Sequence, residues 1–403
     1  MDRRGFLTRS LALGCSAAAS PLLTPVSFAA APGEARLVVI ILRGAMDGLD
    51  VVAPHGDPDF AGLRGGVSLG GAGGHVDLDG FHALHPALSP LLPLWQAGDL
   101  GAVHAVSTPY RDKRSHFDGQ DILEAGVVGL DDGAVREGWL NRMMQHMPDG
   151  RMQTAWAVGR DPQLILDGPV PVSRWAPEAD LALSPQAALL ARQVMKTDPA
   201  MAAALDEAFR VADADGDPLM LTPGEGDGMA AMAAGGGGPG PARRIADFVA
   251  EQLRGEARIA AFSLNGWDTH AAQARGLPRA LSALSNTILG LREGLGPTWG
   301  QTAVLAMTEF GRTARMNGSD GTDHGTGGAM LFAGGALRGG RVLGEWPGLS
   351  EAALYDRRDL MPTRDLRAHA GWVIGGLFGL GRSEIEQAVF PGLDLGSDPG
   401  LLA

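Results

Sequence analysis

The sequence predicts an α/β fold: a doubly wound, mostly parallel β-sheet with helices on both of its faces. Segments typical of buried strands alternate with segments of helical spacing, which is the pattern of such a sheet. The predicted strands are 36–42, 100–106, 258–264 and 302–307, and the predicted helices include 88–96, 115–125, 241–253 and 277–294.

The strands are predicted from continuous apolar runs. RLVVIIL at 36–42 is rich in β-branched residues, as parallel strands covered on both faces are. LGAVHAV at 100–106, RIAAFSL at 258–264 and TAVLAM at 302–307 are runs of the same kind. A further segment, AMLFA at 329–333, is short and apolar.

The segments between the strands differ in composition. Residues 54–80 are rich in Gly and Asp, which predicts a long loop. Ser115 is expected to cap the helix that follows it. Residues 176–256 are predicted as a helical insertion that contains a flexible loop at 222–241, because that stretch consists mainly of Gly, Met, Ala and Pro.

The first 31 residues resemble a cleavable twin-arginine export signal. Arg3 and Arg4 precede an apolar stretch at 7–19 that is too short to span a bilayer, and small residues offer a cut between Ala29 and Ala31. The twin-arginine translocase would then deliver residues 32–403, already folded, to the periplasm. The alternative is an ordinary secretory signal. No later segment predicts a stable transmembrane anchor.

Composition excludes several classes of function. Cys15 is the only cysteine and lies in the signal, so the mature chain has no disulfide, thiolate ligand or cysteine nucleophile. A net charge of −13 argues against nucleic acid as a partner. Two tyrosines are too few for a carbohydrate-binding surface built from aromatic side chains.

Polar side chains follow each predicted strand. Ligands of open α/β sheets bind outside the carboxyl ends of the strands, so these side chains are expected to form one site. They are Asp47 after the first strand, Arg114, Ser115 and His116 after the second, Asp268 and His270 after the third, Glu309 after the fourth, and Asp323 and His324 in a Gly-rich loop.

Carboxylates and imidazoles without sulfur suit one or two divalent ions such as Zn, Mn, Mg or Ca. Ser115 at a helix start, beside Arg114, suits an anion, because backbone N–H groups and positive dipole charge gather there. A metal would activate a hydroxyl or water for attack on a small phosphate or sulfate ester.

Each of these residues also has a structural interpretation. In that interpretation Ser115 is only a helix cap, and Asp47 only completes a turn with Gly48. Asp268 and His270 then hydrogen-bond loop backbone. Another motif, GVSLG at 66–70, has the spacing of a serine-hydrolase elbow around Ser68, but glycines flank it instead of a strand and a helix.

The order of several motifs resembles one known family. The motifs are RGAMDGLD, PYRDKRSHFDGQD, NGWDTHAAQ and TEFGRTARMNGSDGTDHGTGGAM. They are similar to the exported, uncharacterised family of domain of unknown function 1501, and this family resembles the alkaline phosphatase and sulfatase superfamily. The resemblance covers about residues 35–380 and implies an alkaline phosphatase-like fold.

The resemblance also implies roles for particular residues. Ser115 would be the nucleophile, assisted by Arg114 and His116, and the metal-binding residues would be Asp47, Asp268, His270, Glu309, Asp323 and His324. The superfamily usually has Asp-His where this chain has Glu309-Phe310, so a second metal would lack its histidine. The expected function is therefore a periplasmic metal-dependent hydrolase of phosphate or sulfate esters. The alternative is a non-catalytic member of the fold that serves in binding or assembly at the cell surface.

Overall fold

The computed structural model describes residues 34–71, 73–111, 113–130, 137–147, 155–158, 163–175 and 240–403. Ala35–Ala403 belong to one compact unit. The predicted export signal lies outside the described residues, as does the predicted insertion up to residue 239. None of the described helices combines the length and the apolar composition that crossing a bilayer requires.

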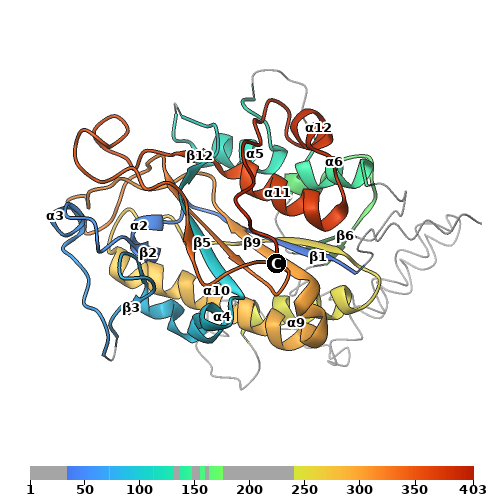
Figure 1. Cartoon of the computed structure of the whole chain (residues 1–403), viewed down its shortest axis with the longest axis horizontal. Helices are drawn as coiled ribbons and strands as arrows, with labels where there is room; N and C mark the ends of the chain where they lie inside the picture. The colour runs from blue at the N-terminus through green and yellow to red at the C-terminus, as the bar shows by residue number, and fades with distance from the viewer. Residues whose placement is uncertain are drawn as a thin grey trace, which may run out of the picture. The chain divides into compact units, whose positions relative to one another are not determined.

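The predicted sheet is present (Figure 1). Its strands run in the order β11-β5-β10-β9-β1-β8-β6-β7, with β12 also paired to β5. Their bounds are β1 (Arg36–Leu42), β5 (Leu100–Ser107), β6 (Ala155–Val158), β7 (Val172–Trp175), β8 (Ile259–Leu264), β9 (Thr302–Met307), β10 (Gly328–Ala333), β11 (Val342–Leu343) and β12 (Arg364–Asp365). All four predicted strands lie in it, and their mostly parallel pairing is confirmed.

One strand runs against the others. β10 contains the apolar segment 329–333 and pairs antiparallel with both β5 and β9. No crossover helix separates it from β9, so the chain re-enters the sheet at the edge where β9 ended. Residues 308–327 therefore begin and end at the carboxyl edge of the parallel strands.

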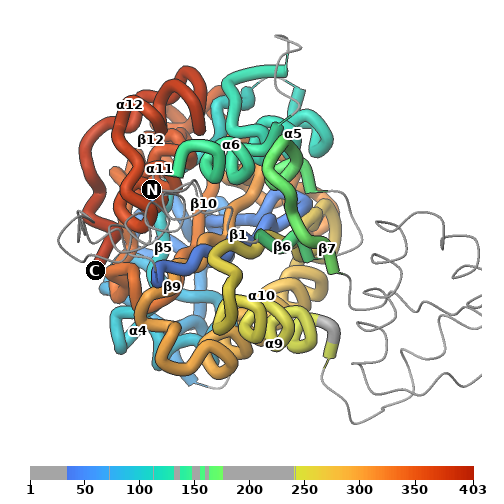
Figure 2. Tube along the Cα trace, turned by 90° about the vertical axis from the view of Figure 1, so that its right-hand side faces the viewer, coloured from blue at the N-terminus to red at the C-terminus, as the bar shows by residue number. Residues whose placement is uncertain are grey.

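Helices cover both faces of the sheet, as predicted (Figure 2). The core on one side contains α6 (Trp139–Gln145) and α11 (Leu366–Phe378), and the core on the other contains α4 (Leu92–Ala97), α9 (Pro241–Arg254) and α10 (Gln273–Leu295). The strands alternate between these cores. In β1, Leu37, Val39 and Ile41 face the first and Val38, Ile40 and Leu42 the second, and this explains why the run is wholly apolar.

The remaining elements are short, apart from α5. They are α2 (Gly48–Val51), β2 (Val52–Ala53), α3 (Phe60–Arg64), β3 (Val76–Asp77), β4 (Ala83–Leu84), η1 (Pro86–Leu91), α5 (His116–Ala125), η2 (Leu164–Leu166), η3 (Gly296–Gln301), α12 (Arg382–Glu384) and η4 (Ile385–Val389). β2, β4 and β3 form a small second sheet. The predicted loop 54–80 thus contains α3 and β3, although Ser68 is in neither. The predicted helix 88–96 is divided between η1 and α4, because prolines at 90 and 93 lack the N–H groups of a continuous helix.

Two buried histidines should make the fold acid-sensitive. Burial lowers the pKa of both His104 and His369 to about 4, whereas it is near 6.5 in an unfolded chain. Between pH 6.5 and 4 the unfolded state therefore binds more protons. The stability that these neutral side chains provide is complete above pH 6.5 and is lost as the pH falls, by up to about 3 kcal/mol for each histidine.

Urea unfolding of the His104→Gln variant between pH 7 and pH 4 measures this effect. The variant should lose less stability on acidification than the parent protein, because it removes one of the two histidines whose pKa is lowered to about 4. His146→Gln, at an exposed position, is the control. Equal losses in the parent and the His104→Gln variant would contradict the assignment.

Candidate metal centre

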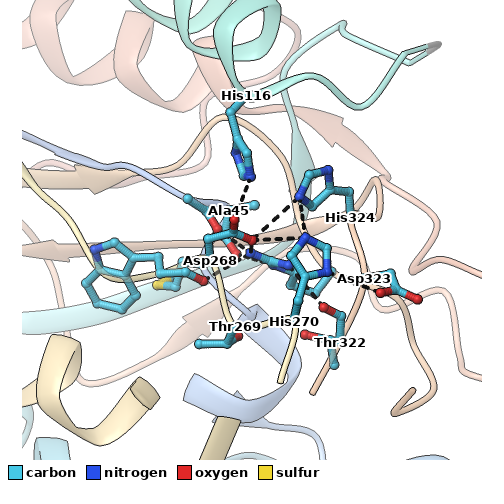
Figure 3. A network of polar contacts seen from close by, with 12 residues as sticks. Ala45, His116, Asp268, Thr269, His270, Thr322, Asp323 and His324 are labelled. Atoms are coloured by element: carbon cyan, nitrogen blue, oxygen red, sulfur yellow. Dashed lines mark hydrogen bonds and ion pairs between the residues drawn. The ribbon is translucent and has the colours of Figure 1, made fainter. Parts of the chain in front are cut away.

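Four side chains converge at the carboxyl ends of the parallel strands (Figure 3). His116 begins α5, Asp268 and His270 lie in the loop after β8, and His324 lies in the loop between β9 and β10. His116, Asp268 and His324 each offer one ligand atom, and these three atoms lie within 4.8 Å of one another. Nε2 of His270 lies 2.8 Å from Nε2 of His324 and 3.1 Å from Oδ1 of Asp268. We call these four residues the histidine–aspartate cluster.

An acceptor holds the other ring nitrogen, Nδ1, of each histidine. Nδ1 of His116 lies 2.8 Å from Oε1 of Glu309, and Nδ1 of His324 lies 2.7 Å from the carbonyl oxygen of Arg114. Nδ1 of His270 lies 3.2 Å from Oδ1 of Asp323. A carbonyl or a carboxylate can only accept, so these contacts favour the tautomer with the proton on Nδ1, in which the Nε2 lone pair of each ring faces the cluster. Metal-binding histidines are oriented in this way.

No described residue places a donor between the Nε2 atoms of His270 and His324. Two Nε2 atoms at 2.8 Å repel each other unless a proton or a metal ion lies between them. Nε2 of His116 is buried and has no hydrogen-bond partner among the described residues, although Oδ2 of Asp268 lies 3.5 Å away. A divalent ion would satisfy these atoms, so the residues present fit a metal.

Charge within the cluster is unevenly distributed. The hydrogen bond to Glu309 raises the pKa of His116, whereas burial lowers the pKa of His324. Burial alone would raise the pKa of Asp268, but its hydrogen bond to Arg312 and the charge of that guanidinium hold it below the ordinary value. Asp268 is therefore ionised near neutral pH, which a metal ligand requires.

Arg312 joins the loops that carry the cluster. Its fully buried guanidinium donates to Oδ1 of Asp268 at 2.5 Å, to the carbonyl oxygens of Ala45 and Thr322 at 2.8 and 3.0 Å, and to those of Gly44 and Trp267. Gly44 allows the close approach, since a Cβ there would lie 2.5 Å from the backbone nitrogen of Asp268. Sequence reasoning missed Arg312, although the residue lies within the TEFGR motif.

Glu309 lies behind His116. Its carboxylate is fully buried, and it accepts from the backbone nitrogen of Gly44 at 2.9 Å and from Nε2 of Gln120 at 3.2 Å, in addition to His116. Burial would raise its pKa, but the His116 hydrogen bond and these donors hold the pKa below the ordinary value. The structure therefore places Glu309 as the residue that orients His116, and not among the atoms that face one another.

Asp47 lies outside the cluster. Both of its oxygens are bonded to Arg64, at 2.7 and 3.0 Å, and Gln273 donates to Oδ2 at 2.7 Å. The same Gln273 amide donates to Asp50, and its oxygen accepts from two threonine hydroxyls. Burial would raise the pKa of Asp47, but Arg64 holds it below the ordinary value. Arg64 and Gln273 were not foreseen from the sequence.

Ser115 and Arg114, which were predicted beside the metal, each contact neighbouring parts of the fold. Ser115 is the N-cap of α5, as predicted, and its Oγ lies 3.5 Å from the backbone nitrogen of Asp118. Arg114 contributes its carbonyl oxygen to His324, and its guanidinium donates to the buried Asp359 at 3.0 Å. Phe310 is buried and stacks on His116, with ring centroids 5.2 Å apart.

The fold and the cluster define a class: an α/β protein with three oriented histidines and one aspartate at the carboxyl edge of its sheet. The family described as "Protein of unknown function (DUF1501)" matches residues 95–378, and the chain belongs to this family. No curated protein sequence matches the chain.

Solved structures resemble the chain at low identity. The crystal structure of Ps i-CgsB is 10% identical, with 88% of this chain and 75% of that chain covered and a TM-score of 0.41. The zinc complex of the C-terminal periplasmic domain of EcEptC from Escherichia coli is 10% identical, with 91% and 92% covered and a TM-score of 0.39. Alkaline phosphatase from the Antarctic bacterium TAB5 is 10% identical, with 77% and 94% covered and a TM-score of 0.33.

Proposed function

We propose that this protein is a metal-dependent hydrolase of phosphate or sulfate esters. The observation that supports it is the set of three histidines that turn their Nε2 lone pairs toward one another beside the Asp268 carboxylate. Nitrogen donors in the majority favour a borderline ion such as Zn²⁺ over Mg²⁺ or Ca²⁺. A bound ion would lower the pKa of a coordinated water or hydroxyl and supply a nucleophile near neutral pH.

The surroundings of the cluster suit a reaction in solvent contact. The side chains of Asp268 and His270 are 46% and 45% exposed, so a substrate can reach them. Ser115 caps the ten-residue helix α5, and His116 is the first residue of that helix. The backbone N–H groups at this helix N-terminus therefore lie next to the cluster, where they favour an anionic ester. Glu309, Asp323 and the Arg114 carbonyl hold the rings in place while the substrate binds.

We further propose one metal ion per chain rather than two. The additional predicted acids are already engaged, since Arg64 and Gln273 bind Asp47 and three nitrogen donors bind Glu309. Phe310 stacks on the ring of His116, and its apolar side chain offers no ligand atom for a second ion. Metal analysis of the purified protein should therefore find about one ion for each chain.

Assays with aryl phosphates and aryl sulfates test the function. Protein prepared without metal should be inactive, and added Zn²⁺ or Mn²⁺ should restore hydrolysis more effectively than Mg²⁺ or Ca²⁺. The absence of both bound metal and hydrolysis across all four ions would contradict the proposal. A second candidate is a non-catalytic metal protein, because four protein ligands also match closed structural zinc sites. Bound metal without hydrolysis would support that candidate.

Ser115→Ala tests the nucleophile. If Ser115 attacks the ester, its loss should reduce kcat by at least about 10³-fold while the bound metal is retained. Measurement of both quantities on the same sample separates this role from a purely structural one. Turnover close to that of the parent protein would limit Ser115 to capping α5 and would make water the nucleophile.

Glu309→Gln should weaken metal binding by about 10- to 100-fold, since residues that orient metal-binding histidines have effects of this size. Gln keeps the shape of the side chain but removes the negative charge that favours the Nδ1 proton of His116. Competition with a chelator of known affinity measures the change. Glu124→Gln is a matched control, because this carboxylate is also buried but pairs with Arg43 instead of a histidine. Equal affinities in both variants would remove Glu309 from the metal centre.

We also propose that the chain reaches the periplasm through the twin-arginine translocase, with cleavage between Ala29 and Ala31. The Arg3-Arg4 pair before a short apolar stretch supports this route. Replacing both arginines with lysine should retain the precursor in the cytoplasm. Normal export of that variant would favour an ordinary secretory signal instead.

A further inference from the structure

A cavity lies beside the histidine–aspartate cluster. Its volume is about 550 Å³, and Asp323, which holds His270, forms part of its wall. Asn317 and Arg358 also line it, and they donate to the carbonyl oxygens of His270 and His324. Three residues of the cavity wall, Asp323, Asn317 and Arg358, thus contact His270 or His324 of the cluster directly.

The cavity is lined partly by apolar side chains and partly by the guanidinium of Arg315. Leu63, Met316, Leu349 and Leu354 supply the apolar surface. Arg315 also lines the cavity, and its guanidinium has no hydrogen-bond or ion-pair partner among the described residues. A guanidinium that remains free beside an apolar wall suits a planar anionic group such as a carboxylate or phosphate.

Arg357 also lines the cavity, and it lies in an unusual turn. Arg358 N donates to the carbonyl oxygen of Tyr355 at 3.0 Å, and the two residues between them, Asp356 and Arg357, have φ values of 51° and 56°. Side-chain-bearing residues rarely adopt this conformation, and such strain gathers at ligand clamps. Arg357 has only a weak pairing with Glu351 at 3.9 Å, and both side chains are largely exposed.

We propose that this cavity receives the non-reacting part of the ester, an apolar group that carries a negative charge of its own. The proposal rests on the function proposed above: the ester would lie at the cluster while its organic group crosses the exposed edge of His270. Arg315 would bind the anionic end, with Arg357 beside it. Asp59 also lines the cavity, and its negative charge would oppose such a ligand.

Fluorescence titration with 8-anilinonaphthalene-1-sulfonate tests the cavity without requiring metal or activity. Arg315→Ala should weaken binding by about tenfold, the size expected for loss of a charge-assisted contact. Asp59→Asn should strengthen binding, and the uncharged N-phenyl-1-naphthylamine should bind more weakly than the sulfonate. Arg254→Ala is the control, because this exposed arginine ends α9, near the edge where the parallel strands begin. Equal weakening in the Arg315 and Arg254 variants would overturn the proposal, as would weaker binding to Asp59→Asn.

Kinetics then test the substrate role. The ratio of KM for phenyl phosphate to KM for 4-carboxyphenyl phosphate should fall by about tenfold in Arg315→Ala, since only the second substrate carries a charge on its leaving group. An unchanged ratio would overturn the substrate role. If neither compound is hydrolysed with any metal, the proposed function and the substrate role fail together, while the fluorescence result still decides whether the cavity binds anions.

Discussion

Asp268→Asn should abolish hydrolysis and weaken metal binding by at least about 10³-fold, beyond the 10- to 100-fold typical of residues behind the ligands. The reason is the central place of this carboxylate: its two oxygens lie within 3.5 Å of Nε2 in His116, His270 and His324. An amide keeps the shape but removes the charge that offsets a divalent ion. Arg312 keeps its contacts with carbonyl oxygens, so the fold should survive.

Two further variants make this result specific. Asp320→Asn changes an exposed acid in the loop that carries His324, and its left-handed backbone is one that asparagine tolerates, so metal binding should be unaffected. Asp323→Asn should give an intermediate loss, because Asp323 orients His270 without facing the other ligand atoms. Metal titration and turnover are measured for all three variants. Equal behaviour of the Asp268 and Asp320 variants would eliminate the cluster as the metal centre.

Arg64→Met should reduce the free energy of unfolding by about 3–5 kcal/mol, because removing one partner of a buried ion pair leaves the other charge uncompensated. The side chains of Asp47 and Arg64 are only 1% and 3% exposed, and they share two hydrogen bonds. Urea denaturation measures the loss. Combining Arg64→Met with Asp47→Asn should recover most of the lost free energy of unfolding, since no unpaired buried carboxylate then remains. Arg254→Met serves as the control for removing an exposed arginine.

The Asp47→Asn/Arg64→Met double variant also distinguishes two roles for Asp47, metal ligand and partner of a buried ion pair. The resemblance to metal hydrolases implies a metal ligand, whereas the structure shows a carboxylate engaged by Arg64 and Gln273. The Asp47→Asn/Arg64→Met protein should therefore bind metal as the parent does. Loss of the bound ion from a stable double variant would restore Asp47 as a ligand.

The sheet was predictable because its strands have a simple composition. A parallel strand covered on both faces is mostly apolar along its length, and β1, β5, β8 and β9 are recognisable on that basis alone. β10 is equally apolar, but its direction depends on the path of residues 308–327, which no local pattern encodes. The elements between 54 and 80 are only two to five residues long, too short for a periodic signal.

The site was predictable in composition but not in arrangement. The carboxyl-edge rule predicts that Asp268, His270 and His324 lie near one another because each follows a strand of the sheet, and their side chains are in contact in the structure. The same rule cannot tell a side chain of the cluster from one that lies behind it, so it treats Glu309 like Asp268. The difference arises from side-chain direction and from partners such as Gln120, which lie far away in the sequence. His116 enters the cluster because it is the first residue of α5 and Ser115 caps that helix.

The cluster draws its side chains from three distant parts of the chain, at residues 116, 268–270 and 324. No single loop or helix carries the complete set, so an ion that needs all of them is a ligand of the folded state alone. By mass action, a free ion concentration one hundred times Kd would add about 2.7 kcal/mol to the free energy of unfolding. The metal supply of the compartment in which the chain folds would thus set its resistance to unfolding and proteolysis, as well as its chemistry.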